Sequence, residues 1–154
     1  MPDTGAREVA AVHVASTLPT GGLPARIGDV LAVDPAGPAV EFEGSWRTWG
    51  QLAETVAQAA ALVRQPGAEV GILLRNRPAS VGLLLGVLRA GGCVVTVNPA
   101  RGTARTREDI AGLDLSVLAG DPADLAELVP PGSAATTAAA TDLGTPLVVE
   151  PGRG

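Results

Sequence analysis

Three short runs of consecutive apolar residues, separated by segments of helical length, constrain the fold of this chain more than any other feature. VGILL (70–74), CVVTV (93–97) and LSVLA (115–119) lack the polar alternation of a strand with one face in water. Such runs are typical of strands buried on both faces, as in a parallel sheet. The order strand, helix, strand, helix, strand, helix over 70–129 therefore predicts parallel neighbours joined by right-handed crossovers.

A hairpin is predicted before these strands. AVEF (39–42) and SWR (45–47) flank Glu43-Gly44, and glycine readily adopts the positive φ that a tight hairpin turn requires. A helix is expected before the hairpin, from Leu23 to the Asp34-Pro35 stop. The predicted fold class is α/β: a Rossmann-like three-layer unit with a mostly parallel sheet, preceded by a short β-hairpin.

Capping signals predict where several helices begin. Thr48 and Gln51 have the spacing of a capping box. Asp121 is placed to cap a helix that reaches Val129, with Asp124 as a first-turn carboxylate. A shorter helix is expected over 106–113, with Glu108-Asp109 near its N-terminus.

The composition of the chain predicts one compact unit with looser ends. Residues 1–21 show weak periodicity and are expected to be weakly structured. Residues 22–129 form the predicted α/β subdomain. Residues 130–154 are an Ala/Thr/Pro/Gly-rich extension, in which we expect little packing over 130–146 and a short strand at 147–150.

The charged residues exclude several classes of protein. The formal net charge is −5 and all 11 basic residues are arginine, so clustered basic residues for binding nucleic acid are not expected. The absence of lysine excludes a Walker-type phosphate lysine and a Schiff-base lysine. A single cysteine cannot form an internal disulfide, and a single histidine leaves no second histidine for a Ser-His or Cys-His pair.

The sequence predicts neither secretion nor a membrane span. No positively charged region precedes AAVHVA (10–15), so a secretory signal is not expected. The most apolar window, 79–97, is interrupted by Arg89 and Gly91-Gly92 and falls short of the roughly 20 apolar residues that a span needs. We therefore expect a cytoplasmic protein.

Arginines at the carboxyl ends of the predicted strands are the best candidates for ligand contacts. Doubly wound sheets bind ligands at this edge, and Arg75, Arg77 and Arg101 follow the first two strands there. Their guanidinium groups have the charge to bind an anion. The alternative, that they are ordinary solvated loop residues, is favoured because surface arginines are common.

The single histidine, the single cysteine and the two Gly-Gly pairs are interpreted as structural residues. His13, in an alternating stretch without a nameable partner, is interpreted as an ordinary histidine. Cys93 begins an apolar strand and is expected to be a buried, inert thiol. Gly91-Gly92 follow a helix, and Gly21-Gly22 follow no strand, so neither pair has the strand-to-helix position of a phosphate loop.

The aromatic pair and the acidic pair near the hairpin are also interpreted as structural residues rather than as ligand-binding or catalytic ones. Trp46 and Trp49 are expected to cover one end of the core, with ligand stacking as the alternative. Glu41 and Glu43 alternate along a predicted strand, but a carboxylate pair does acid–base work only in a suitable cleft. We therefore predict no catalytic, cofactor-binding or metal-binding residue.

Together these segments resemble the opening of the AMP-dependent synthetases and ligases, the adenylate-forming superfamily. The resemblance covers residues 23–129 and lies in three stretches: AVEFEGSWRTWGQLAETVAQAAALV (39–63), VGILLRNRPASVGLLLGVLRAGGCVVTVNPA (70–100) and DLSVLAGDPADLAEL (114–128). The hairpin glycine, the Leu-x-Ala-Gly-Gly segment and the strand ending in Asn98-Pro99 come in the family's order. The connection 65–69 is shorter than is common in the family.

The resemblance implies that the complete enzyme activates a carboxylic acid with ATP and Mg²⁺ as an acyl-adenylate and then passes the acyl group to coenzyme A, as in fatty acid metabolism. The family's phosphate loop, adenine and ribose motifs and catalytic lysine have no match here, so no site residue is carried over. No cofactor is expected to bind this chain tightly. We predict that this chain is the N-terminal part of such an enzyme, inactive by itself, and that it self-associates or pairs with the rest of the enzyme. One alternative is a stand-alone module that binds nucleotide or anion through Arg75 and Arg101. Another is an assembly partner that completes a different chain.

Overall fold

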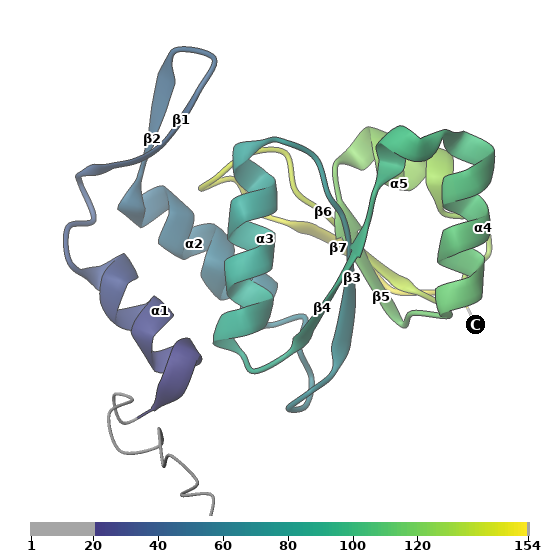
Figure 1. The fold of residues 1–154 in the computed structure, drawn as a ribbon, viewed down its shortest axis with the longest axis horizontal. Coiled ribbons are helices and arrows are strands. Elements are labelled where there is room, and N and C mark those ends of the chain that lie inside the picture. Colours follow the sequence, from purple (N-terminus) through teal and green to yellow (C-terminus); the bar gives the residue numbers. More distant parts are fainter. Residues whose placement is uncertain (1–20, 154) are drawn as a thin grey trace, which may run out of the picture.

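A five-stranded, mostly parallel sheet forms the centre of the molecule (Figure 1). The structure is a computed structural model that describes residues 21–153. Strands run in the order β4-β3-β5-β6-β7, with β7 antiparallel to β6, and β1 and β2 form a separate antiparallel hairpin. The elements are α1 Gly22–Ala32, β1 Pro38–Phe42, β2 Ser45–Thr48, α2 Trp49–Ala60, β3 Glu69–Leu73, α3 Pro78–Arg89, β4 Cys93–Val97, the 3₁₀ turn η2 Pro99–Arg101, α4 Thr103–Leu113, β5 Val117–Gly120, α5 Pro122–Leu128, β6 Thr136–Ala139 and β7 Val148–Glu150.

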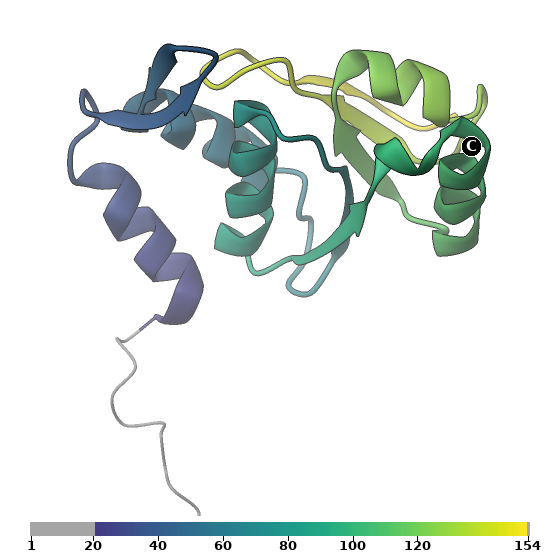
Figure 2. The ribbon, with the colours of Figure 1, turned by 45° about the horizontal axis from the view of Figure 1, so that its top comes forward.

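Helices cover both faces of the sheet, which confirms the predicted three-layer α/β fold. On one face, helices α2 and α3 pack on Val70 and Ile72 of the inner strand β3. On the other face, α4 and α5 pack on Leu73 and Leu118. Helix α1 lies outside this core, where Ile27 and its neighbours pack against α2 (Figures 1 and 2).

The hairpin and two predicted helix starts are confirmed. Glu43 and Gly44 both have positive φ, 51° and 75°, which is the backbone of a tight hairpin turn. Thr48 and Gln51 form a complete capping box, in which each side chain accepts a hydrogen bond from the other residue's amide. Asp121 caps α5 by accepting from the amide of Ala123.

Helix α4 begins earlier than predicted. It starts at Thr103 after Gly102, so Glu108 and Asp109 lie beyond the first turn, and the expected interaction with the helix N-terminus is wrong. Gly102 has no side chain to signal a cap. The buried Thr106 hydroxyl instead donates to the Gly102 carbonyl, 2.8 Å away, inside the first turns.

The expectation of little packing over 130–146 is also wrong. Residues 136–139 form β6, which pairs with β5 in parallel and with β7, and Ala138 is fully buried. Because the side chains of β6 are those of threonine and alanine, the strand carries no strong apolar signal in the sequence. The predicted strand at 147–150 is present as β7.

Strand β4 is the edge of the sheet rather than a strand buried on both sides. Among the described residues it pairs with β3 alone, and Cys93 is exposed, which corrects the prediction of a buried thiol. The edge position depends on the order of strands in the sheet, which the sequence of β4 does not reveal, because the same apolar run is found in central and in edge strands. No helix within residues 21–153 has the length and apolarity to cross a membrane.

Candidate functional site

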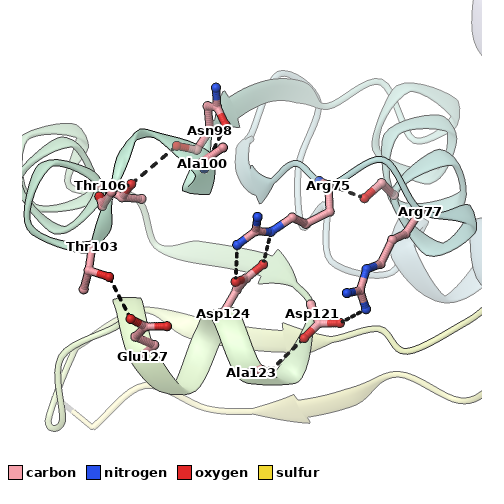
Figure 3. Close-up of polar contacts among 12 residues, drawn as sticks. Arg75, Arg77, Asn98, Ala100, Thr103, Thr106, Asp121, Ala123, Asp124 and Glu127 are labelled. Atoms are coloured by element: carbon pink, nitrogen blue, oxygen red, sulfur yellow. Dashed lines mark hydrogen bonds and ion pairs between the residues drawn. The ribbon is translucent and has the colours of Figure 1, made fainter.

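The carboxyl ends of β3 and β5 meet where the direction of winding changes. The chain passes from β3 to β4 on one side and then returns to place β5 on the other side of β3. In sheets of this kind the crevice at that point is the usual ligand position. Two loops border it: Arg75–Arg77 follows β3, and the Asp121–Asp124 turn follows β5 (Figure 3).

Arg75 bridges the crevice to the first turn of α5. Its Nε lies 2.8 Å from Oδ2 of Asp124 and its Nη2 lies 2.8 Å from Oδ1, a bidentate pair. The Asp124 side chain is only 11% exposed. The hydrogen bond from Arg75 lowers the pKa of the Asp124 carboxyl and raises the pKa of the guanidinium, despite partial desolvation of both groups.

A second ion pair bridges the same loops beside the first. Arg77 Nη1 lies 3.0 Å from Oδ2 of Asp121, whose other oxygen caps α5. Each arginine therefore faces one aspartate (Figure 3), and the pairs balance in charge. An anion entering here would compete with two carboxylates, so the geometry favours a structural role for Arg75 and Arg77.

The third candidate arginine is held elsewhere. Asn98 accepts from the amide of Ala100 and starts the turn η2, which carries Arg101. Arg101 Nη1 lies 3.0 Å from Oδ2 of Asp109 in the following helix. Thr103 links the same helix to α5 by donating to Glu127 (Figure 3). Arg101 thus stabilises its own loop and does not join the Arg75–Asp124 pair.

An open hollow of about 480 Å³ lies beside the crevice, over the ends of β3 and β4. Apolar side chains of Leu74, Val81 and Leu84 line it together with the polar side chains of Asn76 and Asn98. The guanidinium groups at its border are those already paired with aspartates. The hollow therefore offers neutral polar groups and apolar surface rather than a free cation.

The described residues offer few groups that would bind the phosphates of ATP. Residues 21–153 contain no group of three His, Cys, Asp or Glu side chains placed to hold a metal ion. Asp121 caps α5 and Asp124 lies in its first turn, and both carboxylates repel a phosphate. The sequence also has no lysine to bind one.

The remaining candidate residues are scattered. His13 lies outside the described residues. Trp49 packs beside Leu52 in the α1–α2 cluster as predicted, but Trp46 is 61% exposed on the hairpin and covers no core. Glu43 lies in the turn and not on the strand with Glu41, so the two carboxylates are not a pair on one face.

The aspartates that pair with the arginines were not predicted as partners. Their spacing in the sequence predicts a helix cap at Asp121 and a first-turn carboxylate at Asp124. The useful signal is that their turn follows β5, which is parallel to β3 and therefore ends at the same edge as Arg75. The pairing depends on which strand neighbours β3.

Comparisons with known proteins agree with the fold. The sequence model of one protein family, described as AMP-binding enzyme, matches residues 29–145, which is more than half of the chain. The chain therefore belongs to the AMP-binding enzyme family. Bacitracin synthase 1 of Bacillus licheniformis is 32% identical over 91 residues, covering 56% of this chain and 2% of that protein.

Solved structures of adenylate-forming enzymes share the fold. The nonribosomal peptide synthetase FmoA3, in its form bound to α-methyl-L-serine-AMP, has a TM-score of 0.65 at 21% identity, covering 75% of this chain and 13% of its own. A benzoate CoA ligase from Burkholderia xenovorans LB400 has a TM-score of 0.58 at 17% identity, covering 69% of this chain and 22% of its own. This chain thus corresponds to a small part of each relative.

Proposed function

We propose that this chain supplies the N-terminal α/β subdomain of an adenylate-forming enzyme, which activates a carboxylic acid with ATP. The observation that carries the proposal is the family match over 29–145, which runs from helix α1 through β6. Residues 22–129, together with the strands β6 and β7 that complete the sheet, are the proposed subdomain. Its role is to provide the folded framework on which the remaining parts of the enzyme pack.

Two classes of acceptor are consistent with the relatives. We favour an acid–thiol ligase that transfers the acyl group to coenzyme A; a benzoate CoA ligase shares the fold at 17% identity. The 32% identity to bacitracin synthase 1 favours a second candidate, an adenylation unit of a peptide synthetase, whose acid is an amino acid. Both candidates share the acyl-adenylate step, so the proposed reaction class is the same.

We further propose that the chain forms no adenylate by itself. It has no lysine, and the arginines at its strand ends are paired with carboxylates. The test is ATP–pyrophosphate exchange by the purified chain with aryl, fatty and amino acids, beside calorimetric titration with Mg-ATP. We expect exchange at the level of the enzyme-free blank and no saturable heat. Saturable one-to-one binding would favour the alternative of a stand-alone nucleotide-binding module.

A chimera tests the family role directly. Residues 22–150 of this chain replace the matching elements of a benzoate CoA ligase, and adenylate formation is measured by the same exchange assay. We expect exchange with benzoate, because the replaced elements supply framework rather than catalytic groups. A matched chimera with Gly86→Leu, which separates α2 from α3, should be inactive. A folded chimera without exchange would contradict the proposal.

A further inference from the structure

The connection between β6 and β7 takes a long route. The two strands are antiparallel neighbours, which a turn of about two residues can join. Residues 140–147 instead leave the sheet and run to helix α2 and the β1–β2 hairpin before returning (yellow in Figure 2). We refer to residues 140–147 as the strap. Such a detour needs contacts that offset the entropy of ordering it.

Leu143 anchors the middle of the strap. It is 3% exposed and packs in the cluster between α1 and α2, with Ile27, Leu52 and Val56. Removing a leucine side chain from water stabilises the folded state. The apolar contact therefore joins the strap to helices that lie outside the sheet.

Two side chains of α2 accept hydrogen bonds from strap amides. Thr55, which is fully buried, accepts from the amide of Gly144 at 3.0 Å. Gln58, one turn further along the helix, accepts from the amide of Leu147 at 2.6 Å. These bonds satisfy backbone donors of the strap that would otherwise be left without partners.

An ion pair joins the strap to the hairpin. Arg47 Nη2 lies 2.8 Å from Oδ2 of Asp142, and Nε lies 3.1 Å from Oδ1. The other terminal nitrogen of Arg47 donates to the carbonyls of Phe42 and Ser45, 3.2 and 3.0 Å away. One guanidinium therefore fixes the hairpin turn and the strap together.

Strand β7 has little anchorage of its own. It has three residues, it is the edge of the sheet, and Val148 and Val149 are 60% and 50% exposed. Short exposed edge strands contribute few buried contacts and open at low free energy. The strap therefore holds a buried anchor, Leu143, whereas the side chains of Val148 and Val149 in the strand that follows are exposed.

We propose that the strap is a conformational device through which the hairpin and α2 keep β7 in the sheet. Arg47, Thr55 and Gln58 are its positioning residues, and the strap and β7 open together as one unit while β3, β4 and β5 stay folded. This inference rests on contacts within the chain and does not depend on the proposed activity.

Hydrogen exchange of backbone amides in the full chain tests the proposal. In Arg47→Gln we expect the amides of residues 147–150 to exchange about tenfold faster, the factor for loss of one charge-assisted hydrogen bond. Amides of β3 should change less than about twofold, since global unfolding is not required for local opening. The matched control is Arg77→Gln, which breaks an arginine–aspartate pair at the β3–β5 crevice and should leave residues 147–150 unchanged.

Gln58→Leu gives a second, independent readout because Gln58 contacts the strap without touching the hairpin. Faster exchange confined to the strap and β7 in this variant supports the proposal, including in the case that Arg47→Gln fails to fold. Unchanged exchange at residues 147–150, or an equal rise at β3 and β7, overturns it. Equal rises would mean that β7 opens only when the whole sheet unfolds.

Discussion

The Asp124 carboxylate joins the two loops at the β3–β5 crevice through its pair with Arg75. Its carboxylate accepts two hydrogen bonds from Arg75 and lies in the first turn of α5, where a negative charge is favourable. At 11% exposure it has lost most of its hydration. A desolvated carboxylate is stable only while its partner is present, and the same holds in part for the guanidinium.

We predict that Asp124→Asn lowers the free energy of unfolding by about 1–2 kcal/mol, between the values for exposed and buried charged pairs. The amide is nearly the same size but leaves Arg75 without a counter-charge. Asp109→Asn is the control: it breaks the more exposed pairs with Arg101 and Arg105 and should cost less than about 0.5 kcal/mol. Urea titration followed by circular dichroism measures both variants, and equal losses would contradict the assignment.

Stability should fall when the solution is acidified. Hydrogen bonds from Arg75 and Arg47 lower the pKa values of Asp124 and Asp142 in the folded chain. A carboxyl with a depressed folded-state pKa stabilises the protein above its unfolded pKa, about 3.9, and loses this contribution as the pH falls through the folded value. We expect a free energy of unfolding that declines below about pH 4. The decline should be shallower in Asp124→Asn, and an identical slope in both proteins would refute the attribution.

For single residues, the sequence predicted the place of a side chain in the fold better than it predicted which side chains pair with it. The strand-end location of Arg75 and Arg77 follows from the pattern of apolar runs. Their pairing with Asp124 and Asp121 does not, because it depends on β5 lying beside β3, a choice made by the whole sheet. The exposure of Trp46 was missed for a similar reason, since burial depends on what lies over the hairpin.

At the scale of elements, the contact between α2 and α3 is set by a glycine. A Cβ on Gly86 would collide with the Cβ of Ala59 and come within 2.6 Å of the Val56 carbonyl oxygen. The two helices therefore approach through small residues, and both use the contact to cover the same face of the sheet.

Gly86→Ala should destabilise the chain by about 1–3 kcal/mol, the usual cost of overpacking, although alanine has the higher helix propensity. Gly112→Ala in α4 is the matched control, because a Cβ there meets no atom within 4 Å. It should raise the free energy of unfolding by about 0.5–1 kcal/mol through propensity alone. Thermal unfolding of the two variants checks the opposite signs, and a stabilised Gly86→Ala would show that the helices are not in close contact.

Elements whose start or turn is marked by specific nearby residues were predicted correctly, and the elements that were missed have no such residues. The turn at Glu43-Gly44 and the capping box at Thr48 depend on neighbours within a few residues, and both are present. Strand β6 was missed because alanine and threonine give no apolar contrast, and the start of α4 because Gly102 has no capping side chain. The edge position of β4 follows from the strand order.

For the whole molecule, the two edges of the sheet differ in how they are protected. Strand β7 is three residues long and lies between Pro146 and Pro151, which cannot donate hydrogen bonds to another strand. Strand β4 is longer and contains neither a charge nor a proline; within residues 21–153 it pairs with β3 alone, and every residue of the strand except Val97 is exposed or partly exposed. An unprotected edge of this kind is a template for pairing with another chain.

The isolated chain should therefore self-associate through β4. We expect a weight-average mass that rises with protein concentration in sedimentation experiments, because pairing satisfies the free backbone groups of the edge. Thr96→Lys, at an exposed position of β4, should return the chain to a monomer by placing a charge at the edge. Val33→Lys changes an 81% exposed apolar residue after α1 and should leave association unchanged. If Val33→Lys and Thr96→Lys reduce association equally, general apolar exposure rather than the β4 edge is the cause; if neither does, the interface lies on another surface.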